Sequence, residues 1–202
     1  DITDLDAWKN GAGRIAKVNH VGNKIDKVKA TCATNGVKEY YKCSCGKYFE
    51  DAACKKEITD LNAWKEGEGC IAAAKSISLS ATSYTYNGKV KKPTVTVKDS
   101  RGTKIAASNY NVTYGSGRKN VGKYTVKITF KGNYAGKVTK SFKINPKSTT
   151  ISSITPKSKG FTVKWKKKTT QTTGYQIQYS TSSTFKSAKT VTVSRNVTTN
   201  KK

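Results

Sequence analysis

The stretch KYTVKITF, residues 123–130, decides the fold of the basic half of the chain. Its apolar and aromatic side chains occupy every second position and alternate with Lys and Thr, which places one apolar and one polar face on an extended strand. The same alternation recurs in SISLS (76–80), TVTVKD (94–99), YNVTY (110–114) and KVTKSFKI (137–144). Turn signals such as Asn87-Gly88 and Gly132-Asn133 separate these runs. The pattern predicts an antiparallel β-sandwich.

Charge divides the chain into two halves. The 202 residues contain 39 Lys and Arg against 12 Asp and Glu, a net charge of +27. Residues 1–75 hold 13 basic and 11 acidic residues, whereas residues 76–202 hold 26 basic residues and a single acid, Asp99. This contrast predicts a domain boundary near Lys75. The basic half is a polycation that would attract anionic polymers. The alternative is that Lys only fills the solvent face of strands and protects their edges.

A repeat organises residues 1–75. ITDLDAWKNGAGRIAKV begins at Ile2 and ITDLNAWKEGEGCIAAA begins at Ile58, with 11 of 17 positions identical at an offset of 56 residues. Such a period predicts tandem modules, with residues 1–18 as the tail of a preceding repeat and residues 19–75 as a whole one. In the second copy we expect a short helix with Thr59 as its N-cap and Gly67 at its end. Trp64 is expected in the core of this small module.

The cysteine-bearing stretch between the two copies carries a resemblance. It reads VNHVGNKIDKVKATCATNGVKEYYKCSCGKYFEDAACKKE and is similar to repeats in secreted surface proteins of Gram-positive, clostridia-like bacteria. The matching positions are His20, Cys32, Gly36, Tyr40, Tyr41, Cys43, Cys45, Gly46 and Phe49. The sequence departs from that pattern in one respect, because Cys43 and Cys45 are separated by one residue where the repeats have two.

Two interpretations of these thiols stay open. His20, Cys32, Cys43 and Cys45 supply one imidazole and three thiolates, a donor set suited to a structural zinc ion. A secreted setting instead favours a disulfide from Cys32 to Cys43 or Cys45. A catalytic Cys–His pair that includes His20 is disfavoured, since nothing in the sequence marks a group that would orient the imidazole.

The other two cysteines are predicted to form a disulfide with each other. Arg14 occupies the position of Cys70 in the first copy, so Cys70 is not common to both repeats. The first-copy counterpart of Cys54 would precede Asp1. Cys54 and Cys70 are therefore predicted as an added pair.

The basic half resembles two known kinds of module. YTYNGKVKKPTVTVKDSRG, NYNVTYGSGRKNVGKYTVKITFKGNY and KSFKI are similar to a bacterial immunoglobulin-like domain, which implies a sandwich over residues 76–146 with a spacer role. After the linker NPKSTT, KGFTVKWKKKTTQTTGYQIQYSTSSTFKSAKTVTV resembles the first half of a fibronectin type III domain, with Trp165 at its core position. Residues 147–202 are too few for a full sandwich of about 90–100 residues, so we expect an incomplete domain.

These observations predict a mainly β, non-catalytic modular fragment of an extracellular or cell wall-associated bacterial surface protein. We expect a stalk or adhesion role, with neighbouring modules of the same polypeptide as partners and a cationic face for an anionic cell-wall polymer or a host or dietary glycan. One His and the scarcity of carboxylates argue against acid–base catalysis. Few Arg residues argue against specific nucleic-acid binding, and no apolar run is long enough for a membrane span. The alternative is a set of accessory modules of a secreted hydrolase whose catalytic domain lies outside this chain.

Overall fold

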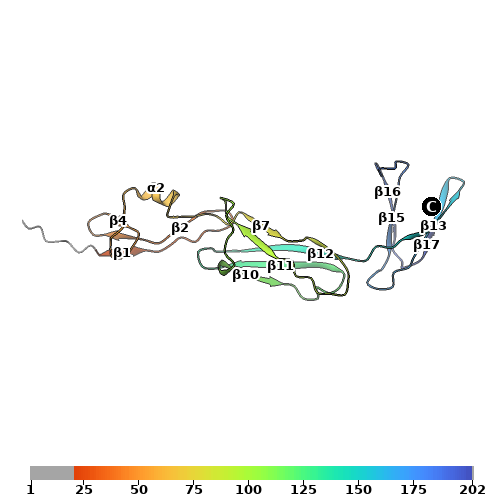
Figure 1. The fold of residues 1–202 in the computed structure, drawn as a ribbon, viewed down its shortest axis with the longest axis horizontal. Coiled ribbons are helices and arrows are strands. Elements are labelled where there is room, and N and C mark those ends of the chain that lie inside the picture. Colours follow the sequence, from red (N-terminus) through yellow and green to blue (C-terminus); the bar gives the residue numbers. More distant parts are fainter. Residues whose placement is uncertain (1–20, 202) are drawn as a thin grey trace, which may run out of the picture. The chain divides into compact units, whose positions relative to one another are not determined.

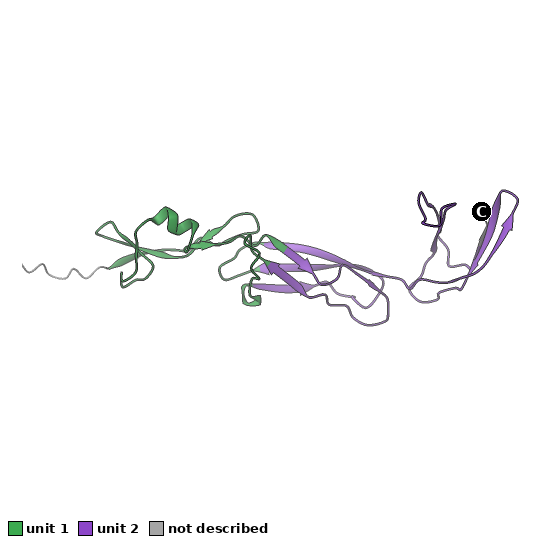
Figure 2. Ribbon diagram, turned by 45° about the horizontal axis from the view of Figure 1, so that its top comes forward, with its two compact units in different colours: residues 1–76, 98–109, 130–136 green, residues 77–97, 110–129, 137–202 purple. Residues whose placement is uncertain are grey.

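The structure is a computed structural model that describes residues 21–201, and the first repeat copy and His20 lie outside them. The described chain is mainly β, with one α-helix (Figure 1). It divides into two compact units (Figure 2). Unit 1 contains residues 1–76, 98–109 and 130–136, and unit 2 contains residues 77–97, 110–129 and 137–202. No helix among the described residues has the length and apolar character needed to cross a membrane.

Unit 1 is built on short strands. Its four-stranded sheet has the order β1 (Gly22–Ile25), β3 (Tyr40–Cys43), β4 (Tyr48–Phe49) and β5 (Glu57–Ile58). A two-stranded sheet pairs β2 (Gly36–Val37) with β6 (Cys70–Ile71). The helix α2 (Leu61–Glu66) lies between β5 and β6 in the sequence. The buried apolar residues of unit 1 include Ala30, Cys43, Phe49, Ile58, Trp64, Ile71, the alanines at 72–74, Ile105, Phe130 and Tyr134.

The helix follows its sequence signals with one difference. Asp60, not Thr59, is the N-cap, and its carboxylate accepts the backbone N–H of Asn62 at 2.9 Å and of Ala63 at 3.0 Å. Asp60 prevails because its carboxylate reaches two of the unpaired N–H groups of the first turn. Gly67 ends the helix as predicted. Trp64 is 8% exposed, which confirms its place in the core.

Two segments from the basic half belong to unit 1. The segment 130–136 is bonded to Ala30, which accepts from the N–H of Ala135 at 2.8 Å and donates to the carbonyl of Asn133 at 3.0 Å. The segment 98–109, which ends in the 3₁₀ turn η1 (Ala107–Asn109), donates the N–H of Ser100 to the carbonyl of Ala73 at 2.8 Å. The change of charge near Lys75 does not reveal these long-range bonds.

In unit 2, a four-stranded sheet has the order β10 (Tyr110–Tyr114), β11 (Gly122–Phe130), β12 (Lys137–Asn145) and β8 (Ser83–Thr85). A second sheet pairs β7 (Ser76–Leu79) with β9 (Val95–Lys98). The predicted alternation is confirmed, because Val97, Val126, Ile128, Phe142 and Ile144 are at most 2% exposed. The antiparallel prediction fails for one pair of strands, because β12 and β8 run parallel.

Residues 151–201 form two small sheets. One has the order β13 (Ile151–Lys157), β14 (Gly160–Trp165) and β17 (Thr199–Lys201), and the other pairs β15 (Tyr175–Tyr179) with β16 (Lys189–Val193). Trp165 is 4% exposed, so its predicted inward orientation is confirmed. The ring pairs Trp165–Tyr175 and Phe161–Tyr179 connect the two sheets. Every residue of β13 is exposed, and this edge strand contributes little to the core.

Candidate functional site

The outward side of β11 and β12 carries the first candidate site. Lys123, Lys127, Lys137 and Lys143 are exposed and alternate with the buried residues of the same strands. The register sets Lys123 directly opposite Lys143, and sets Lys127 and Lys137 opposite threonines. We call these four side chains the lysine face. Its remaining positions on the two strands are Thr, Ser and Asn145, so the face is polar and cationic.

No carboxylate side chain of unit 2 neutralises this face, because unit 2 contains no Asp or Glu. The ion pairs found among the described residues all lie between Lys24 and Glu68 in unit 1. Asp99 belongs to unit 1, where its carboxylate accepts the backbone N–H groups of Arg101 at 3.0 Å and Thr103 at 2.8 Å. Within unit 2, no acidic side chain therefore offsets the charge of the lysine face.

A second group of cations in unit 2 lies over tyrosine rings. Lys91 Nζ is 5.4 Å from the ring centre of Tyr84, while Lys92 Nζ and Arg118 Cζ are 5.6 Å and 5.1 Å from that of Tyr114. Arg118 is fixed by the carbonyls of Lys91 at 3.1 Å and Gly115 at 2.8 Å. Burial raises the pKa of Tyr114. These contacts hold the loop around Lys91 against the loop around Arg118. The sequence did not predict them, because the two loops are far apart along the chain.

Two of the predicted zinc ligands lie together. Cys43 ends β3 and is buried, and its Sγ accepts the backbone N–H of Cys45 at 3.4 Å. Gly46 completes the turn with a φ of 87° and donates its N–H to the carbonyl of Cys43. The turn therefore brings two of the predicted zinc ligands together.

The rest of the predicted zinc set is not assembled by the described residues. Cys32 lies in a separate turn over residues 31–34, where the carbonyl of Thr31 accepts the N–H of Ala74. His20 lies outside the described residues. Within residues 21–201 no group of three His, Cys, Asp or Glu side chains is arranged to hold a metal ion. A zinc ion bound by His20, Cys32, Cys43 and Cys45 therefore stays a prediction.

Cys54 and Cys70, the predicted pair, carry no bond to each other in the structure, and their pairing stays a prediction. Both side chains are thiols. Cys70 lies in β6 opposite Val37, whereas Cys54 follows β4 and its sulfur lies beside Gly22 of β1. The two residues therefore belong to different parts of unit 1. Sequence comparison of the two repeat copies indicated only that both cysteines are additions, which does not place them near each other.

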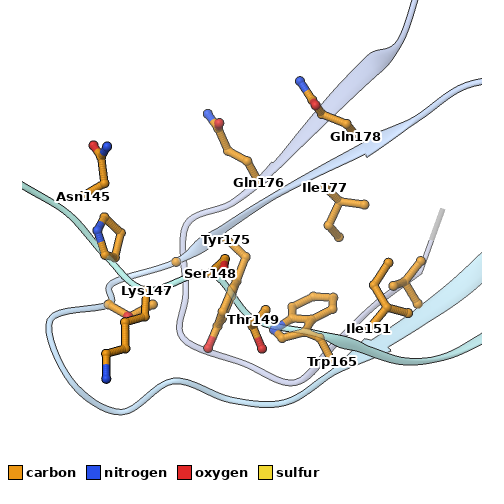
Figure 3. A pocket seen from close by; sticks show the side chains of 14 residues that line it. Asn145, Lys147, Ser148, Thr149, Ile151, Trp165, Tyr175, Gln176, Ile177 and Gln178 are labelled. Carbon is orange, nitrogen blue, oxygen red and sulfur yellow. The ribbon is translucent and has the colours of Figure 1, made fainter. Parts of the chain in front are cut away.

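A cavity of about 430 Å³ is lined by the segment 145–149 and by residues of the two small sheets of residues 151–201 (Figure 3). Trp165 and Tyr175 line it, whereas Gln176 and Gln178 extend away from the indole ring. The buried Nε1 of Trp165 has no hydrogen-bond partner among the described residues. The Tyr175 hydroxyl accepts from the N–H of Lys168 at 2.8 Å and donates to Asn196 Oδ1 at 2.6 Å. The cavity is an incompletely filled core, bordered by a well-bonded tyrosine.

Comparison with protein-family models, with curated proteins and with solved structures gave no match to this chain.

Proposed function

We propose that the chain is a non-catalytic stalk or adhesion fragment of an extracellular surface protein, and that its lysine face binds anionic polymers. One observation carries the proposal: unit 2 has no acidic side chain, and two of its lysines face each other directly across paired strands. Like charges at such positions destabilise a sheet. A bound polyanion would remove that repulsion, which gives the face a physical reason to bind one.

The predominance of lysine over arginine in unit 2 supports a polymeric partner that carries a negative charge on each repeating unit. Lysine is a compact, hydrated charge on a flexible stem and lacks the planar fork with which arginine recognises phosphates and bases. Binding through such groups depends mainly on counterion release, with little selection for sequence or shape. Repeating phosphates or carboxylates, as in wall polymers or acidic glycans, match this chemistry better than a specific nucleic-acid site.

The test measures binding of the full chain to polyglycerol phosphate at about 50 mM and about 200 mM salt. We compare a K123Q/K127Q/K143Q variant with a matched control, K24Q/K47Q/K56Q, whose lysines are ion-paired in unit 1. Both variants lose the same net charge. The lysine-face variant should bind more weakly, with a salt slope smaller by about one per lysine removed, and the control should keep the wild-type slope. Equal losses in both variants, or no binding at the lower salt, would contradict the proposal.

The small core of residues 19–75 supports a second proposal, that a structural metal ion or a disulfide staples this module. Modules of this size bury too little apolar surface for much stability of their own. The role as accessory modules of a secreted hydrolase remains the alternative. The sequence of the parent gene on either side of this segment distinguishes it, because only the alternative requires an encoded catalytic domain there.

A further inference from the structure

The sulfur of Cys54 lies on the same face of the unit 1 sheet as the side chain of Cys43. Strands β1 and β3 pair with Gly22 opposite Cys43. A Cβ atom added at Gly22 would lie 3.1 Å from Cys54 Sγ and 2.6 Å from the Cβ of Tyr41, which is two residues before Cys43 on β3. Directly opposite residues, and residues two apart on one strand, share a face of a sheet. The sulfur of Cys54 therefore occupies the side-chain space that Gly22 leaves open, on the face of the sheet that carries Tyr41 and Cys43.

The turn that carries Cys54 is held in a defined conformation. The carboxylate of Asp51 accepts hydrogen bonds from the backbone N–H groups of Lys55 at 3.1 Å and Lys56 at 2.8 Å. The backbone carbonyl of Asp51 accepts a hydrogen bond from the backbone N–H of Cys54 at 3.1 Å. Cys54 has a φ of 53°, in the left-handed region that non-glycine residues seldom adopt. A strained residue held by its surroundings is a frequent mark of a functional position. Here the strained backbone directs the Cys54 side chain toward β1.

We propose that Cys43 and Cys54 are joined by a disulfide in the oxidised protein. The bond replaces the predicted Cys54–Cys70 pair and joins the turn after β4 to the end of β3. Cys43 is favoured over Cys45 because Cys43 lies within the paired strand opposite Gly22, whereas Cys45 lies in the exposed turn beyond it. Burial raises the pKa of the Cys54 thiol, and the charges of ionised Cys43, Asp51 and Cys45 raise it further, which places these groups near its sulfur.

The oxidant is a small disulfide of the glutathione class. One protein thiolate attacks a sulfur of glutathione disulfide and releases one glutathione thiolate, which leaves a mixed disulfide on the protein. The second protein thiolate then attacks the protein sulfur of that mixed disulfide and releases the second glutathione. The two protein thiols lose two protons and two electrons, and the oxidant gains them as two glutathione thiols.

Tryptic digestion separates the candidate pairings. It yields peptides 30–38 with Cys32, 43–47 with Cys43 and Cys45, 48–55 with Cys54, and 66–75 with Cys70. The full chain is equilibrated with reduced and oxidised glutathione, alkylated, digested and analysed by mass spectrometry. We expect peptide 43–47 joined to peptide 48–55, with loss of two hydrogens. Peptide 48–55 joined to peptide 66–75, or recovered only in alkylated form, would overturn the proposal.

Serine variants assign the sulfur within peptide 43–47. The linked peptide should be lost in C43S and retained in C45S, C32S and C70S. Loss in C45S with retention in C43S would overturn the proposal. Circular dichroism reports whether C43S, which alters a buried residue, still folds.

A glycine variant tests the geometry without removing a thiol. G22A adds a Cβ 3.1 Å from Cys54 Sγ and should slow formation of the linked peptide several-fold. The control N23A alters the neighbouring, exposed residue of β1 and should leave the rate unchanged. Equal rates in G22A and the wild type would contradict the proposed placement. The proposal rests on unit 1 alone, so it and the polyanion proposal can fail separately.

Discussion

Trp64 donates its indole N–H to Glu50 Oε1 at 3.0 Å, and Lys56 Nζ lies 2.9 Å from the same oxygen. This pair joins the helix to the end of β4 and gives the buried indole the partner that its N–H requires. Glu50 is a partly buried carboxylate in contact with the core residue Trp64, with its side chain 25% exposed. The stability of unit 1 should therefore depend on the charge of this residue.

The free energy of unfolding should fall at acidic pH through Glu50. The hydrogen bond from Lys56 lowers the Glu50 pKa, partial burial opposes that effect, and the bond from Trp64 lowers the pKa further. Because the pKa of Glu50 is lower in the folded state than in the unfolded state, the ionised carboxylate stabilises the fold at pH values above its unfolded pKa. This stabilisation is lost as the pH falls below about 4 and Glu50 becomes protonated in the folded protein. Urea unfolding followed by tryptophan fluorescence at pH 7 and pH 3 measures this loss. E50Q should reduce the difference between the two pH values, and an undiminished difference would contradict the assignment.

Gly69 should tolerate no larger residue. A Cβ at this position would lie 2.3 Å from Cε3 of the buried Trp64 ring, so G69A forces the ring or the backbone to move. We expect a loss of about 1–3 kcal/mol in the free energy of unfolding, as for other overpacked cores. G67A is the matched control, because its Cβ meets only the carbonyl oxygen of Ala63 at 3.1 Å. Thermal denaturation of both variants provides the comparison, and equal midpoints would refute the packing argument.

Reversing one charge on the lysine face should stabilise unit 2. K123E places a carboxylate opposite Lys143 and converts a repulsive cross-strand pair into an attractive one. The expected gain is roughly 0.2–1 kcal/mol, and it should shrink at high salt. Urea unfolding at low and high salt tests this, with T125E, which lies opposite Ser141, as the control. A destabilised K123E variant with normal T125E stability would contradict the proposed repulsion.

Trp165 should contribute through its ring and not through its N–H group. Its Nε1 is buried and has no hydrogen-bond partner within residues 21–201, so W165F removes an unsatisfied donor while keeping an aromatic ring against Tyr175. We expect W165F to cost less than about 1.5 kcal/mol and W165A to cost about 3–5 kcal/mol, because alanine enlarges the existing cavity. Chemical unfolding of residues 151–201 within the full chain, monitored by hydrogen exchange, distinguishes the two variants. Equal losses would mean that the N–H group has a partner.

Strands with strong alternation could be predicted from the sequence almost to the residue. Residues 110–114 form a strand as expected, and KYTVKITF begins only one residue earlier, at Gly122. The physical reason is local, since burial of one face fixes the period of two. The short β8, with three residues and a single partly buried tyrosine, gave no such signal, so its parallel pairing with β12 was not foreseen.

The arrangement of the cysteines could not be predicted because it depends on pairing between distant segments. The spacing of Cys43 and Cys45 in the sequence indicated that they lie close together, and the structure places them in one turn. It could not show that Gly22 lies opposite Cys43, or that the turn after β4 returns Cys54 to that face. Comparison of the two repeat copies indicated that Cys54 and Cys70 are additions to the repeat, but this does not show that the two residues lie close together. The role of Gly22, which leaves room for the sulfur of Cys54, can be recognised only after the pairing of β1 with β3 is known.

The parallel pairing of β8 with β12 determines how the sandwich would resist tension. Ser83 lies beside Lys143 and Thr85 beside Asn145, and the Asn145 amide also donates to Ser83 Oγ at 2.8 Å. If the chain is pulled backward from Ser83 and forward from Asn145, the two strands are drawn past each other lengthwise. All the bonds between them then carry the load at once instead of opening singly from one end. The pairing of β8 with β12 would therefore set the force at which unit 2 opens when it is pulled in this direction.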